Sequence, residues 1–224
     1  MINQLTKQYN KLAVLFSRIH DEGNKYSNRV FYNVLRANNL QGKKILDLGC
    51  GNGADIEYYK YRFGDAVTGV DASEKLLEEA KAKSLDVCLG YFDHIPFGDS
   101  AFDTVISKYA FQTSDNMSQI YEEVSRVLQP SGTFIFLVVH HFRQFFEKKS
   151  DHKNFFEKTI VQSVLFDGEV TVEEPTHTMQ EYLSPEFFKR FSLQSYVEKA
   201  DFHSAERIYG NEYPTYMIIS ATKR

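Results

Sequence analysis

The chain of 224 residues is 42% hydrophobic and 15% aromatic, so it is long enough for one domain with a sizeable core and short for two. Its net charge of −4 and isoelectric point near 6.0 argue against a protein that binds nucleic acid by neutralising the phosphate backbone. The two cysteines, Cys50 and Cys88, are too few for a disulfide framework and favour a reducing compartment.

The N-terminal part predicts two helices. It has no apolar stretch longer than residues 12–16, too short for a signal peptide or a membrane span, so we expect a cytoplasmic protein without membrane contact. A helix is expected over residues 3–20 because apolar side chains recur at steps of three and four. These side chains are Ile2, Leu5, Tyr9, Leu12, Phe16 and Ile19. A second helix is expected over residues 27–39, with Ser27 as its N-cap.

From residue 44 onward, short apolar runs alternate with helical segments, which is typical of strand-helix-strand units in a parallel sheet. Strands are predicted at residues 44–48, 66–70, 86–89, 102–107 and 133–139. Helices are predicted at residues 53–63, 74–83 and 115–128. The central part of the chain therefore predicts a parallel α/β sheet.

The last third of the chain is less regular. Two short strands are expected near residues 161–166 and 169–173, and a helix begins at Ser184. Its apolar residues are Phe187, Phe188, Phe191, Tyr196 and Val197. Strands at residues 204–209 and 215–222 close the chain, and we expect them to pair antiparallel because so short a connection cannot join parallel neighbours.

The stretch "ILDLGCGNGAD", residues 45–55, places three glycines in five positions between the first strand and its helix. Open parallel sheets bind ligands at this edge, and glycine lets a ligand touch the main chain. Asp71 stands twenty residues beyond Gly51 at the end of the next strand, where an acid accepts hydrogen bonds from ribose hydroxyls. The pattern predicts a nucleoside site.

The position of Asp47 indicates which nucleoside. It lies two residues before Gly49, so its charge would repel a pyrophosphate and suit a cationic partner. A nicotinamide-dependent oxidoreductase shares the glycine loop and the ribose acid but does not explain Asp47. A sulfonium cofactor does.

The segment "DLGCGNG", residues 47–53, resembles the first motif of the class I S-adenosylmethionine-dependent methyltransferases, acid-x-Gly-x-Gly-x-Gly. Residues 67–83, 95–107 and 123–137 are similar to the family's second strand and helix, its approach to the fourth strand, and its fifth strand with the preceding helix. The likeness covers about residues 44–139, and the end of the chain, 197–224, resembles the family's last helix and closing strands.

The resemblance implies an α/β fold: a Rossmann-like, doubly wound, mostly parallel seven-stranded sheet with an antiparallel C-terminal strand. It also implies a single methyltransferase domain over residues 1–224. Its parts would be N-terminal lid helices at 1–40, a cofactor-binding core at 41–139, a substrate-cover insertion at 140–183, and a C-terminal helix with closing strands at 184–224.

The same resemblance implies S-adenosylmethionine as the cofactor and assigns its contacts. Tyr91 replaces the family's adenine-binding acid, so that contact passes to Asp93 or to the main chain at Phe92. In the turn "LQPSG", residues 128–132, Ser131 replaces a common glycine. Lys108 would contribute its backbone, and Tyr9 would close over the cofactor from the lid. The remaining implied contacts are Asp47, Gly49, Cys50, Gly51, Gly53, Asp71 and Ala72, with Ser73 beside the adenine.

Catalytic candidates follow the fourth and fifth strands. Tyr109 and Phe111 stand where family members contact the methionine end of the cofactor and the substrate, or they only fill the space between strand and helix. His140 and His141 are candidates for a general base, because histidine titrates near working pH; the alternative is a packing or surface role. No metal site is predicted, since no acid or cysteine follows this pair at ligand spacing.

The predicted substrate-cover insertion would surround the acceptor. Its aromatic residues either line an apolar pocket for a small organic acceptor or plug the cover onto the sheet. They are Phe142, Phe145, Phe146, Phe155 and Phe156. The acceptor atom, O, N or C, stays open, as does the choice between monomer and homodimer.

The favoured function is methyl transfer to a small-molecule acceptor. The alternatives are a methyltransferase for nucleic acid or protein, a protein that binds S-adenosylmethionine without transferring methyl groups, and an NAD-dependent oxidoreductase. Base-modifying enzymes of this fold usually carry Asn or Asp, two prolines and an aromatic residue after the fourth strand. Here residues 107–110 read Ser-Lys-Tyr-Ala, which disfavours nucleic acid as the acceptor.

Overall fold

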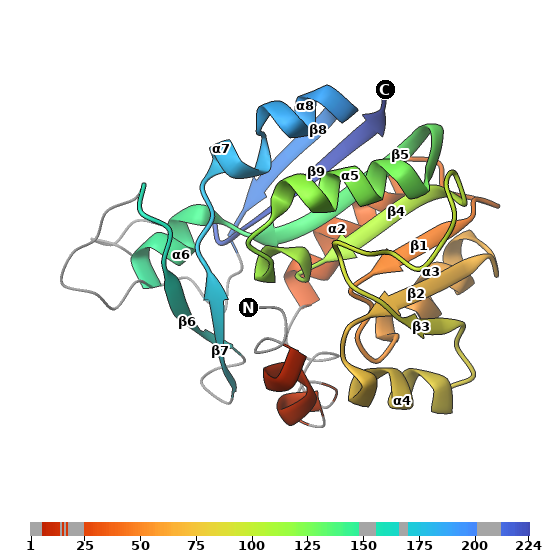
Figure 1. Cartoon of the computed structure of the whole chain (residues 1–224), viewed down its shortest axis with the longest axis horizontal. Helices are drawn as coiled ribbons and strands as arrows, with labels where there is room; N and C mark the ends of the chain where they lie inside the picture. Colours follow the sequence, from red (N-terminus) through yellow and green to blue (C-terminus); the bar gives the residue numbers. More distant parts are fainter. Residues whose placement is uncertain are drawn as a thin grey trace.

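A seven-stranded sheet runs through the centre of the computed structural model, which describes residues 6–13, 15, 17, 25–147, 156–165, 170–200 and 212–224 (Figure 1). The first five strands in spatial order are parallel, and the sixth is antiparallel to both of its neighbours. The order is β3 (Val87–Leu89), β2 (Val67–Asp71), β1 (Ile45–Leu48), β4 (Phe102–Lys108), β5 (Leu128–Val139), β9 (Tyr216–Lys223) and β8 (Phe191–Lys199).

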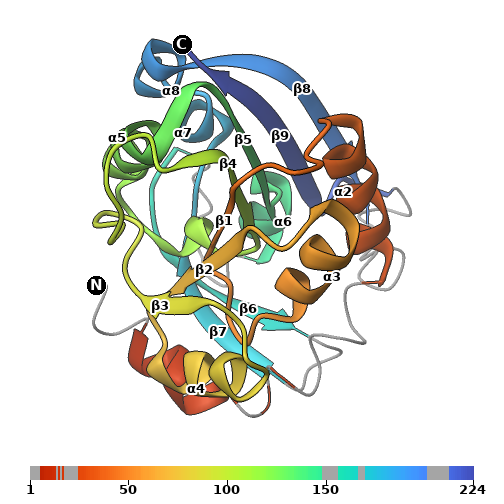
Figure 2. The ribbon, with the colours of Figure 1, turned by 90° about the vertical axis from the view of Figure 1, so that its right-hand side faces the viewer.

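Helices cover both faces of this sheet, so it has two apolar cores (Figure 2). On one face lie α2 (Lys25–Ala37) and α3 (Ala54–Phe63), and on the other α5 (Met117–Val127) and α8 (Pro185–Arg190). The helix α4 (Glu74–Ala82) packs beside β2 and β3. Burial of β1 and β4 by both cores explains their near-continuous apolar sequences.

A smaller unit lies beyond the carboxyl ends of β4 and β5. It consists of the antiparallel pair β6 (Ile160–Leu165) and β7 (Val170–Pro175), with α6 (His141–Glu147) and α7 (Met179–Tyr182) on either side in the sequence. A short 3-10 turn, η1 (Phe111–Thr113), follows β4 and contacts β7. We call residues 141–182 the cover.

The predicted fold class is confirmed, and most predicted elements lie within two residues of the observed ones. The strands expected near 161–166 and 169–173 are β6 and β7. In the N-terminal helix, residues 6–13 are helical as predicted, whereas Ser27 lies inside α2 rather than at its cap because α2 begins at Lys25. None of the helices in the described part of the chain has the length and hydropathy that a membrane span requires.

The prediction for the C-terminal region is wrong in one respect. The helix that begins at Ser184 ends at Arg190, and Phe191 to Lys199 form β8, the antiparallel partner of β9. The spacing of the phenylalanines indicated a longer helix. Because β8 is an edge strand with an irregular register after Leu193, its apolar and polar residues alternate only weakly. The strand expected at residues 204–209 lies outside the described residues.

Gly53 joins the glycine loop to α3 and provides a test of this geometry. Its φ is +77°, and a Cβ there would stand 2.3 Å from Leu85 Cδ1. We predict that Gly53→Ala lowers the free energy of unfolding by about 2–4 kcal/mol, combining left-handed strain with overpacking. Gly98→Ala, at a position with open space around it, should change it by less than about 0.5 kcal/mol. Equal denaturation midpoints for the two variants would contradict this.

Candidate functional site

The glycine loop leaves its main chain exposed to a ligand at one point. Gly49, Gly51 and Gly53 have φ values of +85°, +54° and +77°. A Cβ on Gly49 would lie 2.3 Å from Ala110 Cβ, which brings the segment after β4 against the loop. A Cβ on Gly51 would meet only Leu76, at 3.9 Å, so the main chain there is accessible from the ligand side.

Asp71, at the end of β2, fastens this loop to the next strand. Its Oδ2 accepts a hydrogen bond from the Gly51 N–H at 2.8 Å, and its Oδ1 accepts one from Ser73 N–H at 2.8 Å. Burial raises the pKa of this carboxyl, and the backbone N–H groups of Ser73, Gly51 and Ala72 lower it in part. Each carboxylate oxygen has a second lone pair, so the pair of oxygens suits two ligand hydroxyls, as the predicted ribose contact requires.

Asp47 is buried, 2% exposed, at the tip of β1. Within the described residues its Oδ2 has no hydrogen-bond partner. Burial raises the pKa of the Asp47 carboxyl well above its ordinary value, the charge of Asp55 raises it further, and Lys108 opposes both. A buried carboxylate in this state is stabilised by a positively charged or hydrogen-donating ligand.

The side chain of Lys108 is bound within the protein, while the predicted contact of its backbone with the cofactor stays a prediction. Its Nζ lies 2.6 Å from Asp55 Oδ2 and donates to Asn28 Oδ1 at 2.9 Å. Tyr32 O–H donates to Asp55 Oδ1 at 2.5 Å. Sequence reasoning missed Asp55, Asn28 and Tyr32; the one available signal was an acid two residues after the last glycine of the loop.

Cys50 and the adenine candidates occupy different surroundings. Cys50 faces inward, because a Cβ on Gly69 would stand 2.6 Å from its Sγ, so only its main chain serves the loop. The ring of Phe92 lies 3.4 Å from where a Gly49 Cβ would be. Asp93 is half-buried in the turn where Tyr91 pairs with His94. The assignment of adenine contacts to Phe92 and Asp93 stays a prediction.

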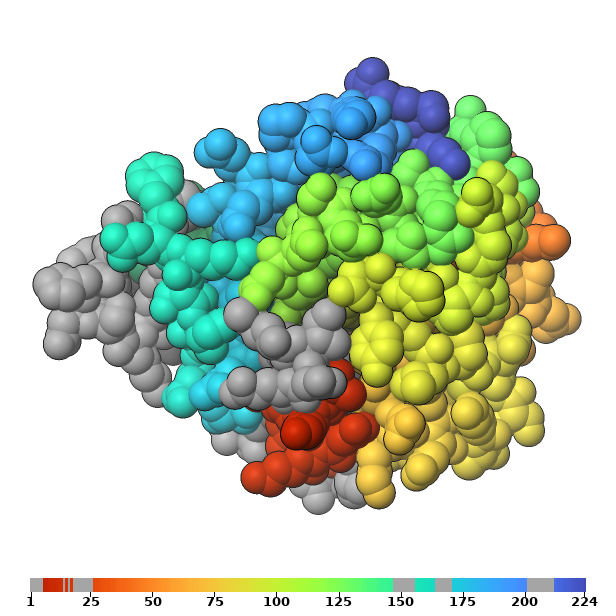
Figure 3. All heavy atoms as spheres, in the orientation of Figure 1, coloured from red at the N-terminus to blue at the C-terminus, as the bar shows by residue number. Residues whose placement is uncertain are grey.

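The N-terminal helix bridges the cover and the cofactor edge. Gln8 Nε2 donates to the Glu173 carbonyl at 3.3 Å, and Glu173 N–H donates to Gln8 Oε1 at 3.0 Å. Two residues on, Asn10 Oδ1 accepts from Ser73 Oγ at 2.7 Å. Figure 3 shows this helix, in red, on the surface between α4 and the cyan residues of β7.

Tyr9 lies between these two attachments. Burial raises the pKa of its hydroxyl, and the negative charges of Glu174 and Asp71 raise it further, so the side chain lies between the cover and the ribose acid. This location is the one expected for a lid tyrosine. Its contact with a cofactor remains a prediction.

The comparisons with known proteins agree with this geometry. Residues 46–136 match the family described as methyltransferase domain. A crystal structure named as an S-adenosylmethionine-dependent methyltransferase from Listeria monocytogenes is 28% identical, with a TM-score of 0.65, over 83% of this chain and 93% of that one. Residues 46–136 therefore belong to the methyltransferase domain family, and the chain is similar over most of its length to that S-adenosylmethionine-dependent methyltransferase.

Two curated relatives of this methyltransferase differ in their acceptors. One is the glycine/sarcosine/dimethylglycine N-methyltransferase of Actinopolyspora halophila, 38% identical over 42% of this chain and 18% of that protein. Another is the fatty-acid O-methyltransferase of Mycolicibacterium smegmatis, 28% identical over 52% of this chain and 44% of that protein. The chain spans less than two thirds of the length of these relatives, so the likeness concerns mainly the cofactor-binding core.

Among the residues predicted to face the methionine end of the cofactor, Tyr109 and Phe111 have different environments. Tyr109 has a φ of +51°, unusual for a residue with a side chain, and its N–H donates to the Leu137 carbonyl at 2.7 Å. Phe111 is fully buried against Phe136 and Tyr182, so it is a core residue. The methyltransferase keeps strained backbone at Tyr109, next to the cofactor loop.

His140 is not placed to act as a base, because both ring nitrogens are engaged. Its Nδ1 accepts from Phe142 N–H at 3.1 Å, and its Nε2 lies 2.8 Å from Glu198 Oε1. Burial lowers the pKa of the ring, against the effect of Glu198. The neutral ring therefore ties the start of α6 to β8. His141 stacks on it with ring centroids 4.1 Å apart.

The aromatic pocket predicted for the cover does not form from most of its proposed members. Phe142, Phe146 and Phe156 are exposed to solvent, by 82% for Phe156, and Phe155 lies outside the described residues. Phe145 packs edge-on against Phe146. Among its described residues, the cover buries the apolar side chains of Val161, Val172 and Tyr182 together with several polar ones. The buried polar residues are His141, Gln144, Ser163, Glu174, Thr176 and His177.

The ion pair of Lys108 with Asp55 provides one test. Lys108→Met leaves a buried carboxylate without its cation, so we predict a loss of about 3–5 kcal/mol in the free energy of unfolding. As the control, Lys83→Met removes a half-exposed lysine 3.9 Å from Glu57 and should cost less than about 1 kcal/mol. Urea denaturation measures both. Equal losses would show that the Lys108 pair is energetically an ordinary surface pair.

The buried histidines predict a dependence of stability on pH. Burial and the neighbouring His140 lower the pKa of His141 from 6.5 to about 4. The unfolded chain therefore binds this proton first, and the free energy of unfolding falls as the pH drops from about 6.5 to 4, by up to about 1.4 kcal/mol per pH unit. His141→Gln should lose this part of the slope in denaturation at several pH values. Parallel curves for the two proteins would contradict the assignment.

Proposed function

We propose that this methyltransferase transfers the methyl group of S-adenosylmethionine to a small-molecule acceptor by in-line displacement. The observation that carries the proposal is the buried Asp47 carboxylate, whose Oδ2 lacks a hydrogen-bond partner among the described residues, beside the accessible main chain of Gly51. On the other side of the loop, Asp71 Oδ2 accepts a hydrogen bond from the Gly51 N–H. Together these groups fit a ligand that has a nucleoside at one end and positive charge at the other.

The residues present fit the cofactor of the family. Asp47 would hold its positively charged methionine end, Asp71 its ribose hydroxyls, and the main chain of residues 49–53 its nucleoside. When bound, S-adenosylmethionine supplies a methyl group on a positively charged sulfur, which leaves with the bonding electrons as the acceptor attacks. The N-terminal helix and the cover would exclude water and hold the acceptor in line.

Acid-base chemistry has a minor part in this proposal. A methyl sulfonium already carries a good leaving group, so orientation is the main requirement. His140 is saturated by its own hydrogen bonds, and burial lowers the pKa of His141 to about 4, which makes its ring a weak base. Tyr109 remains a predicted contact of the methionine end of the cofactor and the acceptor, because the adjacent Ala110 touches the glycine loop.

Several features support a small molecule as the acceptor. The net charge of −4 disfavours a nucleic-acid backbone, and residues 107–110 lack the motif of base-modifying enzymes. The relatives named above act on glycine derivatives or on fatty acids. A cytoplasmic location and a monomeric or homodimeric state remain our predictions.

Two conservative variants test cofactor binding. Asp47→Asn and Asp71→Asn each keep the side-chain volume but remove the charge, and each should weaken S-adenosylmethionine binding at least about tenfold, or about 1.4 kcal/mol. Asp103→Asn is the control, since Asp103 accepts from Lys44 N–H at the opposite edge of the sheet. Calorimetric titration measures the three affinities. Wild-type affinity in both Asp47→Asn and Asp71→Asn would contradict the proposal.

Incubation with methyl-labelled S-adenosylmethionine tests the acceptor class. Label should appear in a fraction of small metabolites and not in protein or RNA fractions of a cell extract. Label in RNA or protein would favour the nearest alternative. Binding without any labelled product would favour a protein that senses the cofactor.

A further inference from the structure

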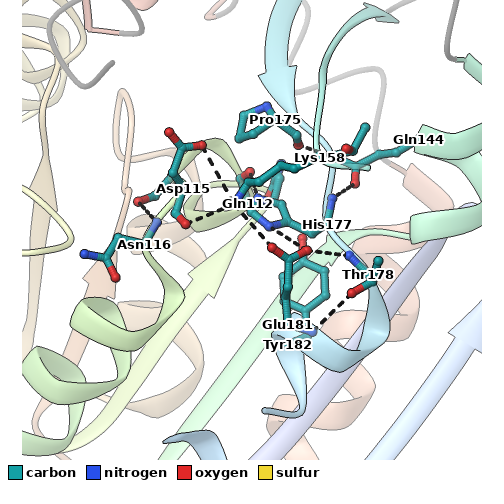
Figure 4. A network of polar contacts seen from close by, with 12 residues as sticks. Gln112, Asp115, Asn116, Gln144, Lys158, Pro175, His177, Thr178, Glu181 and Tyr182 are labelled. Atoms are coloured by element: carbon teal, nitrogen blue, oxygen red, sulfur yellow. Dashed lines mark hydrogen bonds and ion pairs between the residues drawn. The ribbon is translucent and has the colours of Figure 1, made fainter. Parts of the chain in front are cut away.

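Buried polar atoms without hydrogen-bond partners gather where the cover meets the segment after β4 (Figure 4). Among the described residues, three such atoms are Gln112 Oε1, His177 Nδ1 and the Tyr182 hydroxyl. The exposed fractions of the three residues are 3%, 2% and 0%. The main-chain carbonyl of Gln112 contacts His177, whose ring lies against Tyr182. Folded proteins satisfy nearly all buried polar atoms, so three such residues linked in this way point to a bound molecule.

Gln112 joins this cluster to the cofactor side. It lies in η1, two residues after Ala110, whose Cβ lies against the glycine loop at Gly49. Its main-chain carbonyl accepts a hydrogen bond from His177 Nε2 at 2.8 Å. Its side-chain oxygen can only accept, so a partner must donate to it.

His177 presents a second acceptor. A carbonyl oxygen cannot donate, so Nε2 carries the proton in its hydrogen bond to Gln112. Burial lowers the pKa of the ring to about 4, so the ring is neutral at pH 7 and Nδ1 holds a lone pair. That lone pair faces Glu181 Oε2, another acceptor, at 3.7 Å. A donor placed between or beside these two atoms would satisfy both.

Tyr182 and two acids complete the surroundings. The Tyr182 ring lies against His177, with ring centroids 5.3 Å apart, and Figure 4 shows both beside Gln112. Glu174 is 3% exposed, and its Oε1 accepts from Ser163 Oγ at 2.7 Å and from Gln144 Nε2 at 3.4 Å. Burial raises the pKa of the Tyr182 hydroxyl, and the negative charges of Glu174 and Glu181 raise it further.

Further hydrogen bonds hold the residues around this cluster in place. Gln144 Oε1 accepts from His177 N–H at 3.0 Å, and Thr178 and Glu181 form a reciprocal cap at the start of α7. Lys158 Nζ donates to the Asp115 carbonyl at 3.0 Å and lies 3.3 Å from Glu181 Oε1. These contacts fix the unpartnered atoms in position, which is what recognition of a small polar group requires.

We propose that the methyl acceptor is a small amine, and that Gln112, His177 and Tyr182 bind its N–H groups. This inference rests on the proposed function. A neutral primary amine offers two donor hydrogens to these acceptors and keeps the lone pair that must attack the methyl carbon. The negative charges of Glu174 and Glu181 favour the positive charge that the nitrogen gains as the methyl group is transferred and the sulfur keeps the electrons of the broken bond. An alcohol offers one donor, and a carboxylate offers none and is repelled. The site therefore selects amines over acids.

Ligand-detected NMR and calorimetry on the protein saturated with the demethylated cofactor, S-adenosylhomocysteine, test this selection. The probes are propylamine, propanol and propionate, and benzylamine, benzyl alcohol and benzoate. At least one amine should bind about tenfold more tightly than its alcohol, and the acid should not bind. Gln112→Met and Tyr182→Phe, which remove one polar atom each, should each weaken amine binding by about tenfold. In the ligand-free protein these variants should melt at the same temperature or higher, because they remove an unsatisfied atom.

Tyr59→Phe is the matched control, since the Tyr59 hydroxyl is also buried without a partner among the described residues but lies in α3. It should leave amine binding unchanged. The inference is overturned if neither amine binds better than its alcohol, or if Gln112→Met and Tyr182→Phe bind the amine like the wild type. The inference is equally overturned if the three atoms bind only water and the site shows no preference for amines. Failure of S-adenosylhomocysteine to bind would contradict the proposed function itself.

Discussion

The arrangement of this site depends on one buried carboxylate. Asp47 lies at the tip of the central strand β1, where burial and the charge of Asp55 disfavour its ionised form. Lys108 compensates only in part because its ammonium group is paired with Asp55 at 2.6 Å. The protein thus maintains a deficit of positive charge at the edge of the sheet where open α/β folds bind ligands. We propose that a cationic cofactor removes that deficit.

A chain of contacts through the segment after β4 connects the glycine loop to the cover. Asp71 fixes the glycine loop from one side, while Ala110 touches Gly49 from the other. Two residues further on, Gln112 reaches the cover through His177. Both ends of this path carry buried atoms that lack partners within the described structure. We propose that one end holds the cationic cofactor and the other a donor-rich acceptor, the arrangement that methyl transfer between two bound molecules requires.

Sequence reasoning succeeded where the chain follows local rules. The alternation of strands and helices was predictable, as was the placing of the glycine loop after β1 and of Asp71 at the end of β2, because these features depend on short local patterns. The nucleoside contacts of these residues remain predictions. Sequence reasoning failed at β8, an edge strand whose Phe191, Tyr196 and Val197 continued the helical spacing of Phe187 and Phe188, and at the cover, where exposed aromatics such as Phe156 suggested a pocket. Contacts such as Lys108 with Asp55 join residues far apart in the chain, and no local pattern encodes them.

The most direct test of this account is the proton balance of cofactor binding. Titration calorimetry with S-adenosylmethionine near neutral pH, in two buffers of different ionisation enthalpy, measures the protons released. Since a cationic ligand lowers the raised pKa of Asp47, the wild-type chain should release more protons on binding than Asp47→Asn. Equal proton release by the two proteins would contradict the claim that Asp47 holds the positive charge of the cofactor.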